Sequence, residues 1–227
     1  MVKVIIVVPV FNESAVIHKV LKAIPKKING ISKIDIIVVN DGSTDESQFE
    51  VKRAGFVTVD HVINRGLGAA IKTGMEYARE KKADIMVTFD GDGQHDPADI
   101  QKIILPIIQK KAELVIGSRF KKSKNVPLDR FFLNWVANFI TFLFYGVVTT
   151  DSQSGLRAFS KKALNVVDFK GERMDFSSEI LLEAKRNNLK IAEVPIRVIY
   201  SEYSRKKGQT NLNAIPTFAR FLVRLLR

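Results

Sequence analysis

The sequence predicts an α/β fold in which a mostly parallel sheet is covered by helices on both faces. Two observations predict it: the first 120 residues contain five short apolar runs, and amphipathic helical patterns separate them. Continuous apolar strands that alternate with amphipathic helices are typical of parallel sheets buried on both faces. A third observation is that polar residues gather just after the strands, where sheets of this kind bind ligands.

The first half of the chain alternates strands and helices in a regular order. The expected strands are short and rich in Val and Ile, as buried strands are; they cover Val4–Val8, Ile34–Val39, Val57–Val62, Ile85–Phe89 and Leu114–Ile116. Between them, apolar residues recur at helical spacing. This predicts helices over residues 14–27, 44–54, 67–82 and 97–110.

An 18-residue apolar run, Phe131–Val148, lies in the second half. Its length fits a short transmembrane helix, but polar residues recur in it at helical intervals: Asn134, Asn138, Thr141 and Tyr145. This spacing lines one face of a helix. The broad apolar face contains Phe131, Phe132, Trp135, Phe139 and Phe142. We therefore predict an amphipathic interface helix, with a core helix packed on the sheet as the alternative.

The net charge of +12 is unevenly distributed, because residues 190–227 carry half of it. The loop 119–130 adds Lys121, Lys122 and Lys124, and the final segment, Leu212–Arg227, forms a second amphipathic basic pattern. Such surfaces suit anionic lipid, a phosphorylated substrate or nucleic acid. The aromatic residues cluster in the two amphipathic segments instead of alternating with basic residues on a sheet face, which argues against an RNA reader. We expect a membrane surface and no nucleic acid as partner.

The chain carries no signal for export. It contains no cysteine, which excludes disulfides and thiolate metal sites and suits a reducing compartment. The first apolar run stops at Asn12 and Glu13 without a small-residue cleavage pattern, so it predicts a buried strand. We expect a cytoplasmic protein, peripheral on the cytoplasmic face of the membrane.

Motifs of polar residues and glycine follow four successive strands. They are Pro9-Val10-Phe11-Asn12-Glu13, Asn40-Asp41-Gly42-Ser43-Thr44-Asp45, Asn64-Arg65-Gly66-Leu67-Gly68 and Asp90-Gly91-Asp92-Gly93-Gln94-His95-Asp96. The carboxyl ends of parallel strands share one edge of the sheet, where ligands bind. Four motifs at this edge predict a binding site.

Asp90-Gly91-Asp92 is the most informative of these motifs. Two carboxylates one residue apart can share Mg²⁺ or Mn²⁺, with the phosphates of a ligand completing the coordination. Gln94 offers a further oxygen, and the glycines at 91 and 93 would let a ligand approach the backbone. A turn without a metal is the alternative.

Other phosphate and metal motifs do not fit. A calcium loop of the EF-hand type needs glycine and glutamate where His95 and Gln101 stand. The run Gly66–Ile71 follows the third strand and ends in isoleucine, so it is a poor dinucleotide fingerprint, and no Gly-Lys-Ser/Thr follows. We interpret it as close packing of a helix on the sheet beside the ligand.

The four motifs, in this order and spacing, resemble family 2 glycosyltransferases of the GT-A fold. Gly117-Ser118-Arg119-Phe120 and Asp151-Ser152-Gln153-Ser154-Gly155-Leu156-Arg157 are similar to motifs of the dolichyl-phosphate mannose and glucose synthases. The resemblance covers essentially all 227 residues. It implies a single catalytic domain, with residues 1–120 binding the nucleotide-sugar and 121–227 facing the acceptor and the membrane.

The resemblance also implies roles for individual residues. The nucleobase and ribose would be held by Pro9, Phe11, Glu13, Val39 and Asp41. Metal and diphosphate would be bound by Asp90, Asp92 and Gln94, with Gly91 between the carboxylates. Besides Asp92, the expected catalytic residues are Arg119 and Arg130, which would face the acceptor phosphate, and Arg205 on a late loop. The alternative for each arginine is a surface ion pair, and Arg119 is the one that we expect to avoid it.

The late loop departs from the family pattern. The segment from Arg205 to Asn211 ends in asparagine where the family has lysine. Either Lys206 or Lys207 makes the phosphate contact of the missing lysine, or the donor is not GDP-mannose.

The expected reaction is inverting, metal-dependent transfer of a hexose from a nucleotide-sugar to a polyprenyl (dolichyl) phosphate. GDP-mannose, UDP-glucose and UDP-GlcNAc fit the motifs equally. A hydroxyl acceptor is the first alternative; it would need a carboxylate base, for which Asp175 and Glu179 are the candidates. A catalytically inactive lipid-binding homologue is the second.

Overall fold

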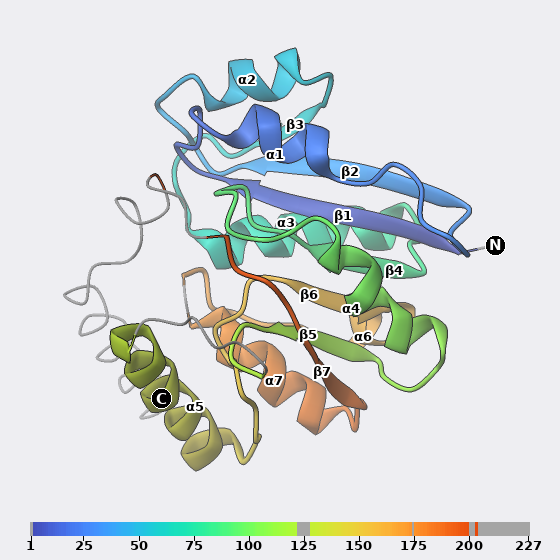
Figure 1. Cartoon of the computed structure of the whole chain (residues 1–227), viewed down its shortest axis with the longest axis vertical. Coiled ribbons are helices and arrows are strands. Elements are labelled where there is room, and N and C mark those ends of the chain that lie inside the picture. Colours follow the sequence, from blue (N-terminus) through green and yellow to red (C-terminus); the bar gives the residue numbers. More distant parts are fainter. Residues whose placement is uncertain (1, 122–127, 174, 200–202, 204–227) are drawn as a thin grey trace.

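The computed structural model describes residues 2–121, 128–173, 175–199 and 203, and for residues 128–130 the backbone alone. A seven-stranded sheet runs through the molecule in the order β3-β2-β1-β4-β6-β5-β7 (Figure 1). Its strands are β1 Lys3–Val10, β2 Lys33–Asn40, β3 Thr58–Asp60, β4 Ile85–Thr88, β5 Leu114–Ser118, β6 Arg157–Ser160 and β7 Ile191–Pro195. All neighbouring strands pair in parallel except β6, which is antiparallel to β4 and β5. The predicted mostly parallel sheet is confirmed.

Helices cover both faces of this sheet, as the apolar strands predicted. The helices are α1 Ile17–Ala23, α2 Ser47–Arg53, α3 Leu67–Glu80, α4 Asp99–Ile108, α5 Leu128–Tyr145, α6 Lys161–Val166 and α7 Phe176–Arg186. Alternate residues of β1 enter two separate cores: Val4 and Ile6 pack with α1, α2 and α4, whereas Ile5 and Val7 pack with α3, α6 and α7. A strand buried on both faces must be apolar throughout.

Several predicted elements differ from the structure in their limits, and the first helix, predicted over residues 14–27, covers only Ile17–Ala23. The third strand covers only three residues, because the chain on either side of it leaves the sheet and exposes Val57 and Val62. Helix α5 begins and ends three residues earlier than predicted. It ends at Gly146, which has a φ of 60° and whose N–H donates to Phe142 O over 2.7 Å. A glycine in this conformation is a common helix stop.

The second half of the chain completes the sheet, which the sequence did not predict. Strand β6 lies between β4 and β5, and β7 forms the edge beside β5. The boundary expected at residue 120 therefore falls within one continuous sheet, and the division of roles between the two parts stays a prediction. Both strands are short, and the polar residues in them, Arg157 and Glu193, hide the apolar pattern.

Helix α5 lies at the edge of the molecule, beside α7 (Figure 1). Its predicted polar stripe faces the protein, while six phenylalanine and tryptophan side chains of the opposite face are exposed: Phe131, Phe132, Trp135, Phe139, Phe142 and Phe144. The rings of Phe132, Trp135 and Phe139 stack in series, with centroids 6.3 and 5.8 Å apart. The interface-helix prediction thus fits better than the core-helix alternative. In the part of the chain that the structure describes, no helix is long and apolar enough to span a membrane.

Candidate active site

The predicted site residues gather where β1 lies between β2 and β4. Strands β2, β1 and β4 are neighbours and run in parallel, so the loops after them lie at one edge of the sheet, where such sheets bind ligands. The loops after β1 and β2 are tied together. Asn12 N donates to Ser43 Oγ over 3.0 Å, and Thr44 N donates to Asn12 Oδ1 over 2.8 Å.

Glu13 lies in the loop after β1, and its backbone is held by a hydrogen bond. Its N–H donates to Ser47 Oγ over 2.7 Å, and its carboxylate accepts from the hydroxyl of Tyr203 over 2.8 Å. Burial and the Glu13 carboxylate raise the pKa of that hydroxyl. Tyr203 therefore brings the chain after β7 back onto the loop after β1.

Asp41 holds the loop that leads into α3. Its Oδ1 accepts from His61 Nδ1 over 2.7 Å and from Arg65 N over 3.0 Å. Its Oδ2 accepts from Asn64 Nδ2 over 3.0 Å and from Gly66 N over 2.7 Å. A carboxylate has about four acceptor sites, and the four donors occupy them. Asp41 thus fixes the loop before α3, and its contact with a ribose or base stays a prediction.

Asp90 is held from two sides directly after β4. His95 Nε2 lies 2.9 Å from Asp90 Oδ2, and the His95 ring is buried, with Nδ1 lacking a partner among the described residues. On the other side lies the backbone of Gly155, where a Cβ would come within 2.0 Å of Asp90 Oδ2. Burial opposes ionisation, but His95, Arg119 and Arg157 hold the pKa of Asp90 below its ordinary value.

Asp92 carries the opposite perturbation. Burial and the charge of Asp90 raise the pKa of Asp92 to about 6. Gln94 steadies it, since its backbone N–H donates to Oδ1 over 2.9 Å and its Nε2 donates to Oδ2 over 2.7 Å. Gln94 thus offers its amide nitrogen, not its oxygen, to Asp92.

These two carboxylates fit a divalent cation that is shared with a ligand. No group of three or more acidic, histidine or cysteine side chains suited to a metal occurs among the residues described. Two close carboxylates that oppose each other's ionisation, together with ligand phosphates, are the usual surroundings of Mg²⁺. Metal binding by Asp90, Asp92 and Gln94 stays a prediction that this chemistry supports.

Several predicted nucleotide contacts lie deeper than expected. Val39 and Pro9 are buried, and the side chain of Val39 belongs to the core under α3, whereas Phe11 is exposed. A Cβ at Gly91 would come within 2.9 Å of Pro9 O. Gly91 thus packs closely on β1, and the approach of a ligand to its backbone stays a prediction.

The glycine run before α3 also has a different role from the one predicted. A Cβ at Gly66 or Gly68 would meet the carbonyl oxygens of Glu172 and Gly171 at 2.4 and 2.1 Å. The start of α3 therefore packs on the loop before α7. Close packing of this helix on the sheet occurs at Gly74, where a Cβ would lie 2.2 Å from Val7 Cγ1.

Arg119 forms an ion pair, but with a buried partner and not at the surface. Its Nε and Nη2 donate to the two oxygens of Asp151 over 2.8 and 2.7 Å, and its N–H donates to Asp151 Oδ2 over 3.0 Å. Asp151 is completely buried, while a quarter of the Arg119 side chain is exposed. The sequence analysis could not find this pair because the aspartate lies 32 residues away, and contact of Arg119 with an acceptor phosphate stays a prediction.

A second arginine, Arg157, is buried beside this pair. It donates to the carbonyl oxygens of Ser152, Ser154 and Ser177 over 2.6, 2.9 and 2.9 Å. Burial lowers the pKa of Arg157 to about 10, against the charges of Asp151 and Asp90, so it is cationic at neutral pH. Arg157 holds the backbone around Asp151 and contributes positive charge near Asp90.

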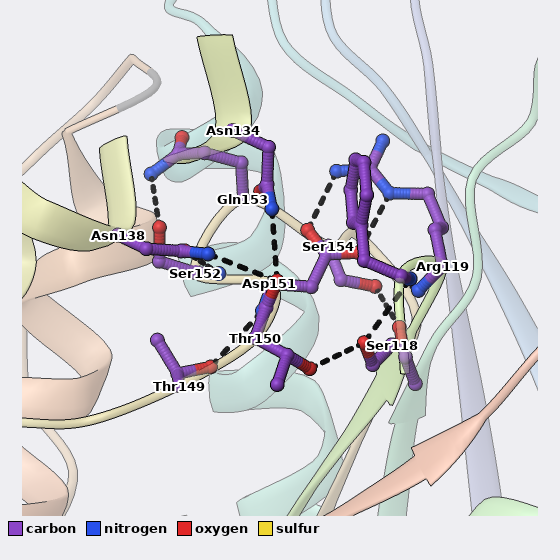
Figure 2. A network of polar contacts seen from close by, with 12 residues as sticks. Ser118, Arg119, Asn134, Asn138, Thr149, Thr150, Asp151, Ser152, Gln153 and Ser154 are labelled. Carbon is purple, nitrogen blue, oxygen red and sulfur yellow. Dashed lines mark hydrogen bonds and ion pairs between the residues drawn. The ribbon is translucent and has the colours of Figure 1, made fainter. Parts of the chain in front are cut away.

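The polar stripe of α5 completes the network (Figure 2). Asn134 Nδ2 and Asn138 Nδ2 both donate to Thr150 O, over 2.8 and 2.9 Å. Thr141 instead contacts Ser178 of α7 over 3.1 Å. The predicted helical face is confirmed, and its amides position the loop that carries Asp151.

Two of the predicted arginines cannot be placed. The side chain of Arg130 and the whole of Arg205 lie outside the described residues, as do Asn211 and the segment Leu212–Arg227. The structure adds residues that our prediction had given no role: His95, Asp151, Gly155 and Arg157. Their signal in the sequence was their position inside the quoted motifs.

Comparison with known proteins identifies the family. Residues 5–167 match the model of the family described as "Glycosyl transferase family 2". The UDP-N-acetylglucosamine–dolichyl-phosphate N-acetylglucosaminyltransferase of Methanococcus voltae is 40% identical, over 96% of this chain and 94% of that protein. The undecaprenyl-phosphate mannosyltransferase of Micrococcus luteus is 27% identical, over 90% of this chain and 87% of that protein.

Solved structures agree at the level of the fold. Glucosyl-3-phosphoglycerate synthase of Mycobacterium tuberculosis superposes with a TM-score of 0.75 at 19% identity, over 99% of this chain and 79% of that one. The same enzyme in complex with Mn²⁺ and UDP-glucose superposes with a TM-score of 0.73. The predicted GT-A fold is confirmed, and the chain belongs to glycosyltransferase family 2.

Proposed function

We propose that this enzyme transfers a sugar from a nucleotide-sugar to a polyprenyl phosphate, and that UDP-N-acetylglucosamine is the first donor to test. The observation that carries the proposal is that carboxylates and an arginine lie close together at one edge of the sheet. Asp90 and Asp92 suit a cation bound to a diphosphate, and the Arg119 side chain lies near enough to lower the pKa of Asp90. The relatives named for polyprenyl-phosphate acceptors support this choice.

The chemistry requires little proton transfer. A phosphate oxygen of the acceptor attacks the anomeric carbon, the bond from that carbon to the donor diphosphate breaks, and the nucleoside diphosphate leaves with the electron pair. A phosphate is already ionised near neutral pH, so no strong base is needed. Mg²⁺ or Mn²⁺ held by Asp90, Asp92 and Gln94 would stabilise charge on the departing diphosphate. Attack opposite the leaving group inverts the anomeric carbon.

A hydroxyl acceptor is less compatible with the site. It needs a carboxylate that can take a proton. Glu179 Oε2 accepts from the N–H groups of Lys170 and Gly171 over 2.8 and 2.9 Å, and Asp175 Oδ1 accepts from Arg173 N over 3.2 Å. Both carboxylates hold the loop before α7, as expected of structural acids.

The exposed aromatic face of α5 gives the proposal a place for lipid. Exposed apolar surface of this size on a helix whose polar face is buried suits insertion between lipid headgroups. Lys121 and the basic residues of the adjoining loop would attract an anionic leaflet. We propose peripheral attachment at the cytoplasmic face, with Arg119, Arg130 and Arg205 meeting the lipid phosphate.

The test is transfer of labelled sugar into a polyprenyl-phosphate extract from a panel of GDP- and UDP-sugars with Mn²⁺. We expect a labelled lipid from one donor, its loss in Asp92→Ala, and its retention in Asp96→Asn. Asp96 belongs to the same loop but accepts from Ala98 N over 2.9 Å, which an asparagine oxygen can also do. Binding of a nucleotide-sugar without any lipid product would refute the lipid acceptor and favour a hydroxyl acceptor.

A further inference from the structure

Helix α5 and the loop of residues 149–154, here called the Asp151 loop, are joined on both sides of Asp151. On one side, Asn134 Nδ2 and Asn138 Nδ2 donate to Thr150 O over 2.8 and 2.9 Å. On the other side, Ser152 N donates to Asn138 Oδ1 over 2.9 Å. A single asparagine thus brackets the aspartate (Figure 2).

The Asp151 loop is anchored to the sheet from the opposite direction. Glu193 of β7 accepts from Thr150 N over 2.7 Å and from Thr150 Oγ1 over 2.8 Å. Thr150 Oγ1 also lies 2.6 Å from Ser118 Oγ at the end of β5. The loop is therefore held between the sheet and α5, and a shift of α5 would act on it directly.

Asp151 transmits this position to Arg119. The two oxygens of the buried aspartate receive Nε and Nη2 of Arg119, a bidentate geometry that fixes both the direction and the plane of a guanidinium. Arg119 N also donates to Asp151 Oδ2. Side chain and backbone of Arg119 are thus both set by one carboxylate.

The opposite face of α5 is apolar and exposed. About half of each Trp135, Phe139 and Phe142 side chain is exposed, whereas the buried positions of the same helix are Asn134 and Thr141. A helix of a soluble domain normally turns its apolar face inward. Helix α5 does the reverse, so the same helix carries a surface suited to lipid and a surface that holds the Asp151 loop.

We propose that α5 is a positioning element for Arg119: Asn138, assisted by Asn134, holds Asp151, and seating of the aromatic face on lipid thereby fixes Arg119 for the acceptor phosphate. The lipid part of this inference rests on the proposed function. Asn134 and Asn138 are positioning residues, since they act on the reacting groups only through Asp151 and Arg119.

The first test measures the Asp151 loop without any reaction. Asn138→Leu removes the hydrogen bonds of Asn138 to Thr150 O and from Ser152 N while keeping a side chain of similar size. Thr141→Val is the matched control, because Thr141 lies on the same buried face but contacts α7. Hydrogen–deuterium exchange of the peptide that covers residues 149–154 is followed with and without vesicles of phosphatidylcholine and phosphatidylglycerol. We expect vesicles to slow exchange in the wild-type protein and in Thr141→Val, and Asn138→Leu to exchange roughly tenfold faster in both conditions.

The second test measures catalysis once a donor is known. We expect Asn138→Leu to raise KM for the polyprenyl phosphate and to leave KM for the nucleotide-sugar and the affinity for Mn²⁺ unchanged. Equal loss of donor and acceptor binding, or the same loss in Thr141→Val, would show a general structural defect and overturn the positioning role. Exchange in the 149–154 peptide that ignores vesicles would overturn the coupling. Because the exchange arm uses neither donor nor acceptor, its result does not depend on the transfer reaction.

Discussion

Asp92 shows how a binding site costs stability at the scale of one residue. In the absence of a cation, its carboxylate lies close to that of Asp90, and burial and this charge raise its pKa from 3.8 to about 6. Since the folded-state pKa exceeds the unfolded one, the ionised form is disfavoured by folding. Above pH 6, the ionised Asp92 therefore lowers the free energy of unfolding of the metal-free protein.

Asp92→Asn is expected to stabilise the metal-free protein at pH 8. It removes the disfavoured charge, so the free energy of unfolding should rise by about 3 kcal/mol. The gain should shrink as the pH falls from 6 toward 4, because Asp92 then becomes neutral in the folded state of the wild-type protein. Urea denaturation in EDTA at pH 8 and at pH 4 measures the free energy of unfolding of both proteins, and Asp96→Asn serves as control. A variant less stable than the wild type at pH 8 would contradict the electrostatic account.

Gly155→Ala is expected to weaken Mn²⁺ binding at least tenfold. The new methyl group would overlap Asp90 Oδ2, which lies 2.0 Å from its position, and the carboxylate must move. The φ of Gly155 is not in the left-handed region, so the backbone itself tolerates alanine. Titration calorimetry measures the affinity, and thermal unfolding checks that the fold survives. Unchanged affinity would mean that Asp90 has another position competent to bind metal.

The central residues of the site could be predicted because they are close in sequence. Asp90 and Asp92 lie one residue apart at a strand end, and that spacing alone indicates a shared cation. The groups that govern Asp90 could not be found in this way. Gly155 reaches it from a loop 65 positions later, because β6 pairs with β4, and this antiparallel pairing leaves no local signal in the sequence.

At the scale of elements, α5 has its polar face inward and its apolar face outward. The inward face contacts groups that need hydrogen bonds, such as Thr150 O, which would be left unsatisfied by an apolar helix face. The outward face is exposed. The spacing of the polar residues predicts that α5 has one polar and one apolar face. It does not predict which face points toward the protein, because the spacing is the same in either case.

We expect α5 to enter lipid, and Trp135 reports this directly because it is the single tryptophan of the chain. Anionic vesicles should shift its fluorescence emission to shorter wavelength. Phe139→Ser should weaken vesicle binding about tenfold, in line with about 1.5–3 kcal/mol for burial of a phenylalanine. Phe49→Ser on α2, which removes an equally exposed ring, should leave binding unchanged. An emission spectrum indifferent to vesicles would refute lipid contact of α5.

At the scale of the whole molecule, the net charge of +12 acts together with this helix. Charge attracts the protein to an anionic surface over roughly one Debye length, and the aromatic residues act only after contact. The two contributions respond differently to salt, so they can be separated.

Binding to anionic vesicles is expected to weaken as salt rises from 0.1 to 1 M, because the screening length falls from about 10 to about 3 Å. Binding that remains at 1 M should depend on Phe139, and vesicles of phosphatidylcholine alone should give this remainder at any salt concentration. Co-sedimentation measures both. Salt-independent binding to anionic vesicles would show that apolar insertion alone holds the protein.

The path of the chain between β5 and β6 has a further consequence. These strands pair side by side, with Ile116 opposite Arg157, so the long excursion between them leaves the sheet and returns to it at neighbouring points. That excursion contains α5 and the Asp151 loop, whereas Asp90 and Asp92 lie outside it. A segment whose two ends are adjacent can be exchanged with little disturbance to its frame. We therefore expect that residues 120–154 can be replaced by their counterpart from a relative to change the acceptor, provided that Arg119 and Gly155, which act on Asp90, are kept.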